Sequence, residues 1–323
     1  MLDQFGRNIE YMRISVTEKC NLRCRYCMPN GADCGTCADT LSRVELLRIC
    51  RTAVSLGITK FKITGGEPLM RRDCVEIIKD IKAMPGVEEV TLTTNALNLS
   101  PVLPALVSAG IDGINISLDS LNPDRYARIT GAAPAMLTRA LDAINACCDL
   151  GIKTKVNCVL LKETSDEVTA LAALAKDNSI DVRFIELMPI GLGARMERAD
   201  PGTALAAIKE MWPQIRPTGE KRGNGPAHYY EIAGFKGKIG FIDAVSHKFC
   251  SECNRVRLTS TGQLKPCLCY GESTDLKAVI QSGADDDALC AALSHAIYSK
   301  PRAHCFDTRE NITEKHMMSQ IGG

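Results

Sequence analysis

The sequence predicts an α/β protein built on a parallel sheet, followed by a C-terminal region with a different pattern. Short apolar β-type runs alternate with amphipathic helical patterns, and this alternation stops after about residue 190. Six successive βα units imply right-handed crossovers, in either an open doubly wound sheet or an incomplete barrel. The expected strands are Tyr11–Val16, Phe61–Thr64, Val90–Thr94, Gly113–Leu118, Lys153–Leu161 and Val182–Leu187.

The helices between these strands have readable starts and ends. Ser42–Glu45 and Thr164–Glu167 both match the capping-box pattern, in which the first side chain and the fourth bond each other's backbone. Glycine typically follows a helix end because it accepts a left-handed backbone. We expect that role for Gly57, Gly86, Gly110 and Gly151.

The change near residue 190 divides the chain into a core, residues 1–190, and a C-terminal region, residues 191–323. Glycines and prolines begin this region, and residues 217–227, rich in glycine and charge, predict a mobile loop. The remaining expected elements are a helix before Trp212, a β-rich stretch over Tyr229–Ile232 and Lys238–Ala244, and helices around Asp275–Gln281 and Asp286–Ser299.

Bulk composition indicates an intracellular enzyme. The 323 residues suggest about two domains, or one large α/β domain with an extension. A hydrophobic content of 45% allows a sizeable core, and a net charge of +1 argues against nucleic-acid binding. No apolar stretch approaches the roughly 20 residues that span a bilayer. Sixteen cysteines without a secretory segment predict metal ligands and reduced thiols in the cytoplasm.

A cysteine triplet follows the first expected strand, where parallel α/β folds place their chemistry. Cys20, Cys24 and Cys27 have the spacing C-x₃-C-x₂-C. Three thiolates leave a coordination position open for chemistry, and soft sulfur ligands select iron–sulfur clusters, zinc or copper(I). The alternative is a structural zinc knuckle completed by Cys34 or Cys37.

A second triplet lies in the C-terminal region. Cys250, Cys253 and Cys267 have the spacing C-x₂-C-x₁₃-C and predict a separate metal site. If Cys269 is a fourth ligand, the site closes as in a zinc ribbon. If only three cysteines bind, the site is a second cluster with an open iron. The spacing leaves both readings open.

Three further motifs follow expected strands. Gly65-Gly66-Glu67-Pro68 lets a ligand approach the backbone closely, although a simple tight turn would also explain it. Thr93-Thr94-Asn95 and Ser117-Leu118-Asp119 end the next two strands and could be ordinary helix N-caps. Beside the first triplet, the glycine motif favours a site for an amino group.

The first triplet resembles the signature of the radical S-adenosylmethionine (SAM) superfamily, and the whole chain resembles its GTP 3′,8-cyclase family of molybdenum cofactor biosynthesis. The second triplet, the arginines beside it and the final glycines point to this family in particular. The matching segments are Arg13–Thr17, Cys20–Pro29, Ile63–Leu69, Leu92–Asn95, Ser117–Asp119, Lys155–Asn157, Phe184–Glu186, Phe249–Leu258 and Gly322–Gly323.

The resemblance implies an incomplete (βα)₆ barrel, two [4Fe–4S] clusters and a lyase activity. The first cluster would cleave SAM to a 5′-deoxyadenosyl radical, which would take the 3′ hydrogen of GTP and lead to 3′,8-cyclo-7,8-dihydro-GTP. The second would bind the guanine edge. SAM would contact Tyr26, Gly66, Ser117 and Met188, with Thr94 and Asn95 in reach of both ligands.

The resemblance also implies a GTP site and a functional tail. The GTP residues would be Arg13, Lys62, Thr93, Lys155, Arg255 and Arg257. Lys62 stands where we expect arginine in many family members, which keeps the charge but loses a bidentate phosphate contact. Gly322 and Gly323 would thread into the active site and help to place Arg255 and the radical's target.

The implied partners are GTP, SAM, a flavodoxin- or ferredoxin-type electron donor, a downstream cyclic pyranopterin monophosphate synthase and a second subunit in a homodimer, with no nucleic acid or membrane. Two other functions remain open at this point. One is a different radical SAM enzyme, peptide-modifying or sulfur-inserting, with an auxiliary cluster. The other is a zinc or iron–sulfur protein without catalysis.

Overall fold

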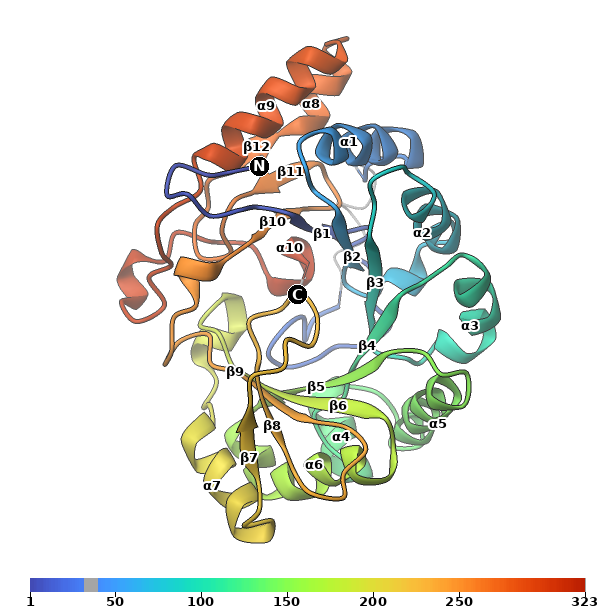
Figure 1. Cartoon of the computed structure of the whole chain (residues 1–323), viewed down its shortest axis with the longest axis vertical. Coiled ribbons are helices and arrows are strands. Elements are labelled where there is room, and N and C mark those ends of the chain that lie inside the picture. Colours follow the sequence, from blue (N-terminus) through green and yellow to red (C-terminus); the bar gives the residue numbers. More distant parts are fainter. Residues whose placement is uncertain (32–39, 323) are drawn as a thin grey trace.

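The computed structural model describes residues 1–31 and 40–322, and its centre is a curved parallel sheet (Figure 1). Six parallel strands lie in chain order, with each strand hydrogen-bonded to the next. Each predicted strand is confirmed within one or two residues at each end. The strands are β1 (Tyr11–Ser15), β2 (Lys60–Thr64), β3 (Glu89–Thr94), β4 (Gly113–Ser117), β5 (Thr154–Leu160) and β6 (Ile180–Glu186).

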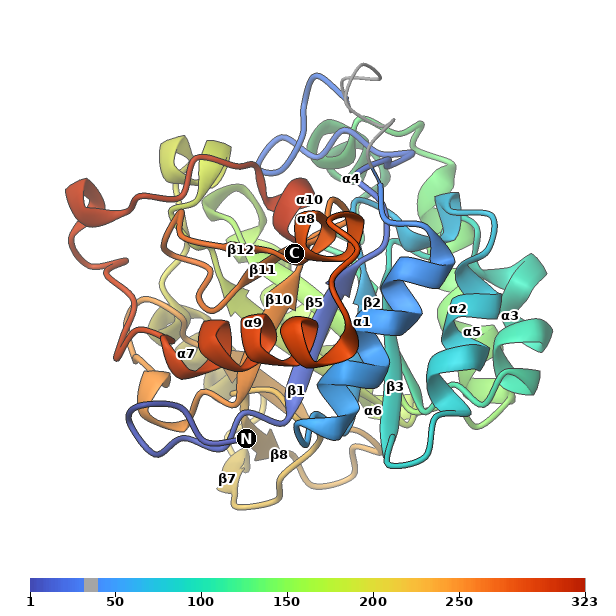
Figure 2. The ribbon, with the colours of Figure 1, turned by 90° about the horizontal axis from the view of Figure 1, so that it is seen from above.

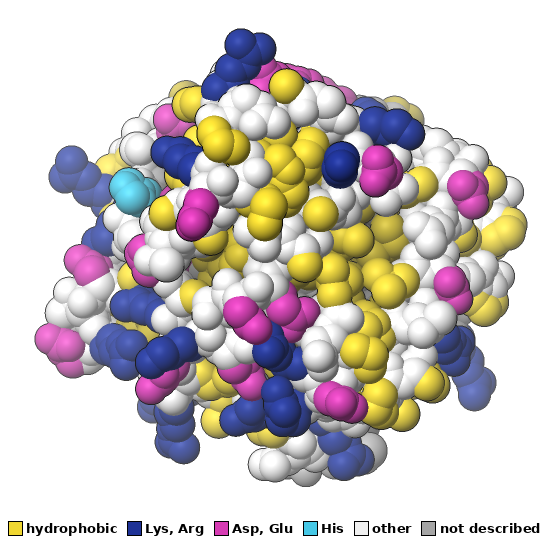
Figure 3. Space-filling model, turned by 90° about the horizontal axis from the view of Figure 1, so that it is seen from below, with side chains coloured by type: hydrophobic (Ala, Val, Ile, Leu, Met, Phe, Trp, Pro, Cys, Tyr) yellow, Lys and Arg dark blue, Asp and Glu magenta, His cyan; other side chains and the backbone are white. Residues whose placement is uncertain are grey.

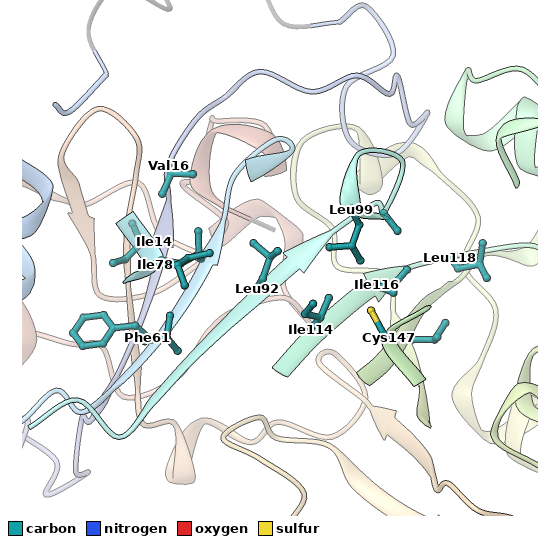
Figure 4. Packing of buried hydrophobic residues seen from close by; sticks show 14 of the residues in the cluster. Ile14, Val16, Phe61, Ile78, Leu92, Leu99, Ile114, Ile116, Leu118 and Cys147 are labelled. Carbon is teal, nitrogen blue, oxygen red and sulfur yellow. The ribbon is translucent and has the colours of Figure 1, made fainter. Parts of the chain in front are cut away.

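Helices cover the convex face of this sheet, as predicted for an incomplete barrel. The side chains that point outward are apolar and pack beneath the helices; Ile14, Phe61, Leu92 and Ile114 are each at most 1% exposed (Figure 4). Residues on the concave face are mostly polar. The covering helices are α1 (Arg43–Ser55), α2 (Cys74–Lys82), α3 (Leu99–Ser108), α4 (Pro123–Thr130), α5 (Met136–Asp149) and α6 (Val168–Asp177).

The C-terminal region extends both edges of the same sheet. Strand β10 (Arg255–Leu258) pairs in parallel with β1, and β9 (Ile239–Ile242) pairs in parallel with β6. Antiparallel strands lie outside each of them: β11 (Gln263–Lys265) and β12 (Thr274–Asp275) beyond β10, and β8 (His228–Glu231) and β7 (Arg216–Thr218) beyond β9. The C-terminal region therefore borders the curved sheet at both of its edges.

Four helices complete the described chain. Helices α8 (Leu276–Gln281) and α9 (Asp286–Tyr298) lie beside α1, and α7 (Pro201–Met211) lies beside α6. A short helix, α10 (Met318–Ile321), brings the C-terminal end to the middle of the curved sheet (Figures 1 and 2). The C-terminal end thus lies inside the fold.

The predicted helix ends are partly confirmed. Ser42 and Glu45 form the capping box of α1, and Gly57, Gly86, Gly110 and Gly151 all have positive φ after helix ends. The second predicted capping box is wrong: Thr164 lies in a 3₁₀ helix, Lys162–Glu167, and α6 begins only at Val168. Glu167 instead accepts the backbone N–H groups of Leu121 and Asn122, because the loop after β4 has unpaired donors there.

In the part of the chain that the structure describes, no helix has the length and apolar character to cross a bilayer. On the face seen from below, Lys and Arg side chains are interspersed with Asp and Glu, in keeping with the near-zero net charge (Figure 3).

Candidate active site

A cavity of about 690 Å³ occupies the concave side of the sheet. Both cysteine triplets line it, although more than two hundred residues separate them in the chain. Their cysteines come from the loop after β1 and from segments around β10 and β11. The two predicted metal sites therefore face one shared space.

The first triplet lies in a compact turn. The backbone N–H groups of Cys27 and Met28 both donate to the carbonyl oxygen of Cys24, at 2.9 and 2.8 Å. Two donors reach Cys20 Sγ: the N–H of Leu22 at 3.4 Å and Asn95 Nδ2 at 3.9 Å. The turn places the three sulfur atoms at the cavity. The side-chain amide of Asn95, just after β3, helps to orient the sulfur atom of Cys20.

The thiols of this triplet need a cationic partner to ionise. Burial raises the pKa of Cys20 to about 11 and that of Cys27 to about 12. Burial, followed by Asp119 and the other two cysteines, also raises the pKa of Cys24 well above its usual range. A coordinated metal deprotonates a thiol outright, so three neighbouring, partly buried thiols fit an iron–sulfur cluster.

The glycine motif packs against the backbone of the triplet loop. Gly66 N–H donates to Thr17 O at 2.7 Å, and a Cβ on Gly66 would lie 2.5 Å from Glu18 O and 2.6 Å from Lys19 O. A side chain at position 66 would therefore displace the loop that carries Cys20. The motif is more than a tight turn, because its glycines let two ligand-bearing loops meet.

Glu67, next in the motif, is a buried carboxylate at the cavity wall. It accepts hydrogen bonds from Thr94 Oγ1 at 2.8 Å, Asn95 N at 2.7 Å and Leu69 N at 3.1 Å. Burial nevertheless raises its pKa to about 7. A cationic amino group beside it would favour its ionised form.

The other predicted SAM residues surround the same end of the cavity. Tyr26 donates to Asp119 Oδ2 at 2.7 Å, and Asp119 Oδ1 accepts the N–H of Val159 at 2.8 Å. Ser117 and Met188 line the cavity at the ends of β4 and after β6. The predicted set, Tyr26, Gly66, Ser117 and Met188, therefore faces one space beside the first triplet.

The second triplet is held by contacts from distant segments. Arg7, itself buried, donates to the carbonyl oxygen of Cys250 at 2.8 Å, and the N–H of His304 approaches Cys250 Sγ at 3.4 Å. Burial alone would raise the pKa of Cys253, but Lys300 and Arg255 bring it below its usual value. This triplet therefore sits in a more cationic environment than the first.

The cysteines that the structure describes are not arranged around a single metal ion. Within residues 1–31 and 40–322, no group of three or more His, Cys, Asp or Glu side chains is spaced to hold a single metal ion. Thiolates that bind different irons of one cluster stand farther apart than ligands of one ion. Cys34 and Cys37, proposed for a zinc knuckle, lie outside the described residues.

Cys269 is buried and does not line the cavity. Its Sγ lies 2.9 Å from Cys305 Sγ and also accepts the N–H of Cys305 at 3.3 Å. Three cysteines, Cys250, Cys253 and Cys267, face the cavity without it. Of the two readings left open by the spacing, a three-cysteine cluster with an open iron fits the structure better.

The far end of the cavity is lined by cations from neighbouring strands. Arg257, Arg13 and Lys62 occupy successive register positions across β10, β1 and β2. Lys155 of β5 and Arg255 of β10 line the same space, and Thr93 of β3 lies near them. All six predicted GTP residues therefore lie on the concave face.

These cations repel one another. Burial, followed by Arg183, Arg13 and Lys155, lowers the pKa of Lys62 well below its usual value. Burial and Arg183 lower the pKa of Lys155 to about 8. Among the described residues, the buried Nε of Arg255 has no hydrogen-bond partner. A bound polyanion would relieve this repulsion and satisfy such donors.

Arg183 is a site residue that the sequence reasoning missed. It projects from β6 and donates to Asn157 Oδ1 at 2.6 and 2.9 Å and to Asn115 Oδ1 at 2.9 Å. Only 6% exposed, it adds a further charge to the cation group. The available signal was an arginine between two apolar residues of a strand, Val182 and Phe184, where a charge is costly unless it is paired or functional.

The predicted mobile loop closes the cationic end of the cavity. Its first two residues belong to β7, and Glu220–Pro226 line the cavity. Arg222 pairs with Asp181 at 2.9 Å, and its carbonyl oxygen accepts a hydrogen bond from Lys155. Whether the loop moves stays a prediction.

The C-terminal tail enters the cavity between its two ends. Met318 and Ser319 line it, and the backbone and side chain of Ser319 lie near enough to the Cys27 thiol to oppose the rise in its pKa. Arg257 Nη1 donates to Gly322 O at 2.5 Å. The resemblance implied that the tail helps to place Arg255, and this stays a prediction; the hydrogen bond to Gly322 comes from Arg257. Gly323 lies outside the described residues.

Known proteins resemble this chain over its whole length. It matches the radical SAM superfamily over residues 14–175 and the molybdenum cofactor synthesis C family over residues 180–306. It is 41% identical to a GTP 3′,8-cyclase of Clostridium perfringens and 38% identical to one of Moorella thermoacetica, with 100% of both chains covered in each comparison.

A solved structure shares the fold. Streptococcus suis SuiB bound to S-adenosylmethionine superposes with a TM-score of 0.66 at 15% identity, over 95% of this chain and 75% of SuiB. At this identity the likeness concerns the fold alone.

Proposed function

This chain belongs to the GTP 3′,8-cyclase family of radical SAM enzymes, and from that premise we propose that its cavity converts GTP to (8S)-3′,8-cyclo-7,8-dihydroguanosine 5′-triphosphate. This lyase reaction is an early step of molybdenum cofactor biosynthesis. The observation that carries the proposal is the pairing of two open cysteine triplets with a group of buried cations in one cavity.

The residues present fit two [4Fe–4S] clusters and SAM. Cys20, Cys24 and Cys27 would hold one cluster, and Cys250, Cys253 and Cys267 the other. When bound, the first cluster and SAM supply the 5′-deoxyadenosyl radical that removes the 3′ hydrogen of the ribose. The protein's task is to hold GTP and SAM so that the reacting atoms meet, and to keep water out.

The SAM end of the cavity would bind the amino acid part of SAM. Glu67 is placed to pair with its ammonium group, since three hydrogen bonds fix its carboxylate at the wall. Asp119, oriented by Val159 and Tyr26, lines the same cavity as a second buried acceptor. Tyr26, Gly66, Ser117 and Met188 would then complete the pocket.

The cationic end would bind the triphosphate. Arginine offers a bidentate fork to phosphate and lysine a point charge, and both are present: Arg13, Arg255 and Arg257 with Lys62 and Lys155. Thr93 and Arg183 would add polar and cationic contacts. A peptide-modifying enzyme has no need for such a buried cation group, and a structural zinc protein has no need for an open cavity.

The second triplet would hold the guanine through its cluster's open iron. This places the ribose between the two ends of the cavity, because base and triphosphate are anchored apart. The four residues assigned to SAM, the six assigned to GTP and the domain boundary near residue 190 are part of this proposal.

We propose four further features of the enzyme's setting. A flavodoxin- or ferredoxin-type protein would donate the electron, and a cyclic pyranopterin monophosphate synthase would take the product. The enzyme would act as a homodimer. Its compartment would be the cytoplasm, where thiols stay reduced.

The test is anaerobic incubation of the reconstituted, reduced protein with SAM and GTP, with the products identified by mass spectrometry and NMR. The proposal predicts a cyclised GTP product together with methionine and 5′-deoxyadenosine. SAM cleavage that is unchanged by GTP and gives no cyclised product would contradict it. Iron and sulfide analysis of the same sample separates this outcome from poor cluster loading.

A further inference from the structure

The segment that leads to the tail has little regular structure of its own. Between the end of α9 at Tyr298 and the start of α10 at Met318, its only helical piece is a 3₁₀ turn, Arg309–Asn311. Yet Ser319 and Gly322 reach defined partners inside the cavity. Ordering such a segment costs conformational entropy, so contacts outside the cavity must hold it.

A buried ion pair fastens this segment to the sheet. Lys265 Nζ lies 2.6 Å from Glu314 Oε2, and the two side chains are 2% and 0% exposed. Lys265 is the last residue of β11, next to the strand that carries Arg257. The contact with Glu314 Oε2 is an ion pair and not an aligned hydrogen bond. The ammonium group donates its hydrogen bonds to the carbonyl oxygens of Tyr270 at 2.9 Å and Gly271 at 3.3 Å.

Glu314 joins this anchor to the residues that precede α10. Its Oε1 accepts the N–H of His316 at 2.8 Å and lies 2.7 Å from the ring Nδ1 of the same residue. The carboxylate therefore spans the distance from the sheet to the tail, with one oxygen on each side.

Backbone contacts around the pair fix the same place. The N–H of Glu314 donates to Cys269 O at 3.3 Å, and the N–H of Gly271 donates to Thr313 Oγ1 at 2.9 Å. A Cβ on Gly271 would lie 2.9 Å from Thr313 O, so the two backbones are in close contact. The tail segment thus lies along the loop that follows Cys267.

Lys265 and Glu314 are not among the residues that line the cavity. Ionised groups taken from water are costly unless their geometry is good, and removing one partner leaves the other charge uncompensated. Five residues after Glu314, Ser319 meets Cys27, and three residues later Gly322 meets Arg257. A displacement at Glu314 would therefore pass directly into both contacts.

We infer that Lys265 and Glu314 are positioning residues for the reaction: their ion pair sets the point from which the tail enters the cavity, and so fixes Ser319 at the first triplet and Gly322 at Arg257. This inference rests on the proposed function for its catalytic meaning. The anchoring itself concerns the folded chain and can be measured without turnover.

The first test is hydrogen exchange of the cluster-loaded protein. Glu314→Gln removes the charge at nearly constant shape, and amides of residues 315–322 should exchange at least about tenfold faster than in wild type because local opening becomes easier. Exchange in β1–β6 should stay unchanged. The matched control is Glu231→Gln, which breaks the 2.9 Å Lys238–Glu231 pair on the opposite edge of the sheet.

The second test measures how tightly SAM cleavage is coupled to cyclisation in the same variants. With Glu314→Gln, the amount of cyclised GTP formed per 5′-deoxyadenosine should fall at least about tenfold. The loss should appear mostly in the kcat of cyclisation, while the rate of SAM cleavage stays within about twofold of wild type. Glu231→Gln should retain wild-type coupling. A general loss of structure would lower both reactions together.

A second variant covers the case in which Glu314→Gln leaves Lys265 uncompensated and fails to fold. Lys265→Met/Glu314→Met removes both charges and keeps a buried apolar contact, and it should release the tail in the same way. Wild-type exchange of residues 315–322 in either folded variant would overturn the inference. If wild type itself forms no cyclised GTP, the proposed function fails, and the exchange result still decides the anchor.

Discussion

Arg257 Nη1 donates a hydrogen bond of 2.5 Å to the carbonyl oxygen of Gly322, which joins the chain's tail to a residue of the proposed GTP site. Gly322 has a φ of +76°, and a Cβ there would lie 3.0 Å from Thr64 Cγ2 and 3.3 Å from Ser15 Cβ. The tail therefore fits only as glycine, and it presses against the inner wall formed by β1 and β2.

Deleting Gly322 and Gly323 should cripple cyclisation and spare SAM cleavage. The guanidinium of Arg257 would lose its partner, while the first triplet keeps its turn. The measurement is the ratio of cyclised GTP to 5′-deoxyadenosine, with iron content as a control for both clusters. A C-terminal tag should do similar harm. Full cyclase activity in the truncated protein would show that the tail is dispensable.

The two triplets should have separable roles. Replacing Cys20, Cys24 or Cys27 by Ala should abolish SAM cleavage, because an open cluster site is lost. Replacing Cys250, Cys253 or Cys267 should remove cyclisation and leave some uncoupled formation of 5′-deoxyadenosine. Iron and sulfide content should fall by about half in either set, since one of two clusters remains. Identical loss of both reactions in both sets, with the untouched cluster present, would refute separate roles.

Lys62 should contribute to GTP affinity and not to SAM affinity. A charge-assisted contact is worth roughly 1.5–3 kcal/mol, so Lys62→Ala should raise the Kd for GTP about 10- to 150-fold. Lys62→Arg should retain or tighten binding, since arginine keeps the charge and adds a planar fork. Isothermal titration with GTP and with SAM checks both. Unchanged GTP affinity in the Ala variant would remove Lys62 from the site.

GTP affinity should fall as pH rises through the pKa of Lys155. In the free protein, burial and Arg183 lower this pKa to about 8. A phosphate beside the amine would raise it, so GTP binding takes up a proton above that pH. GTP affinity is then at its maximum below about pH 7, where Lys155 is protonated, and is roughly tenfold weaker at about pH 9. Lys155→Arg, charged throughout, should flatten this dependence, and SAM binding gives the baseline. A wild-type Kd constant over this range would contradict the assignment.

Much of the core was predictable because each strand carries a local pattern. The run from Gly113 to Leu118 is bounded by turn residues, and its apolar positions read as a buried strand. Motifs at strand ends then placed Cys20 and Gly66 at the same edge of the sheet. After residue 190 the expected β stretches and helices also match β8, β9, α7, α8 and α9. Their place in the sheet was not predictable, because β9 and β10 pair with strands distant in the sequence.

The site residues that escaped prediction depend on non-local contacts. Arg183 stands between apolar residues of its strand, and only the fold shows that its guanidinium donates to the side-chain oxygens of Asn115 and Asn157. Thr164 and Glu167 have the spacing of a capping box, but the carboxylate of Glu167 accepts a hydrogen bond from the loop after β4 instead. The spacing around Cys267 did not show whether Cys269 is a metal ligand. The structure places Cys269 beside Cys305. Such partners are set by tertiary packing, which local patterns do not encode.

The most direct measurement of the central claim, that this cavity holds the ribose of GTP at the site of radical formation, uses GTP deuterated at the 3′ carbon. In a single turnover, mass spectrometry should find deuterium in the 5′-deoxyadenosine, together with cyclised product. GTP deuterated at other ribose carbons should give unlabelled 5′-deoxyadenosine. Absence of transfer from the 3′ position, in protein that holds both clusters and cleaves SAM, would contradict the account.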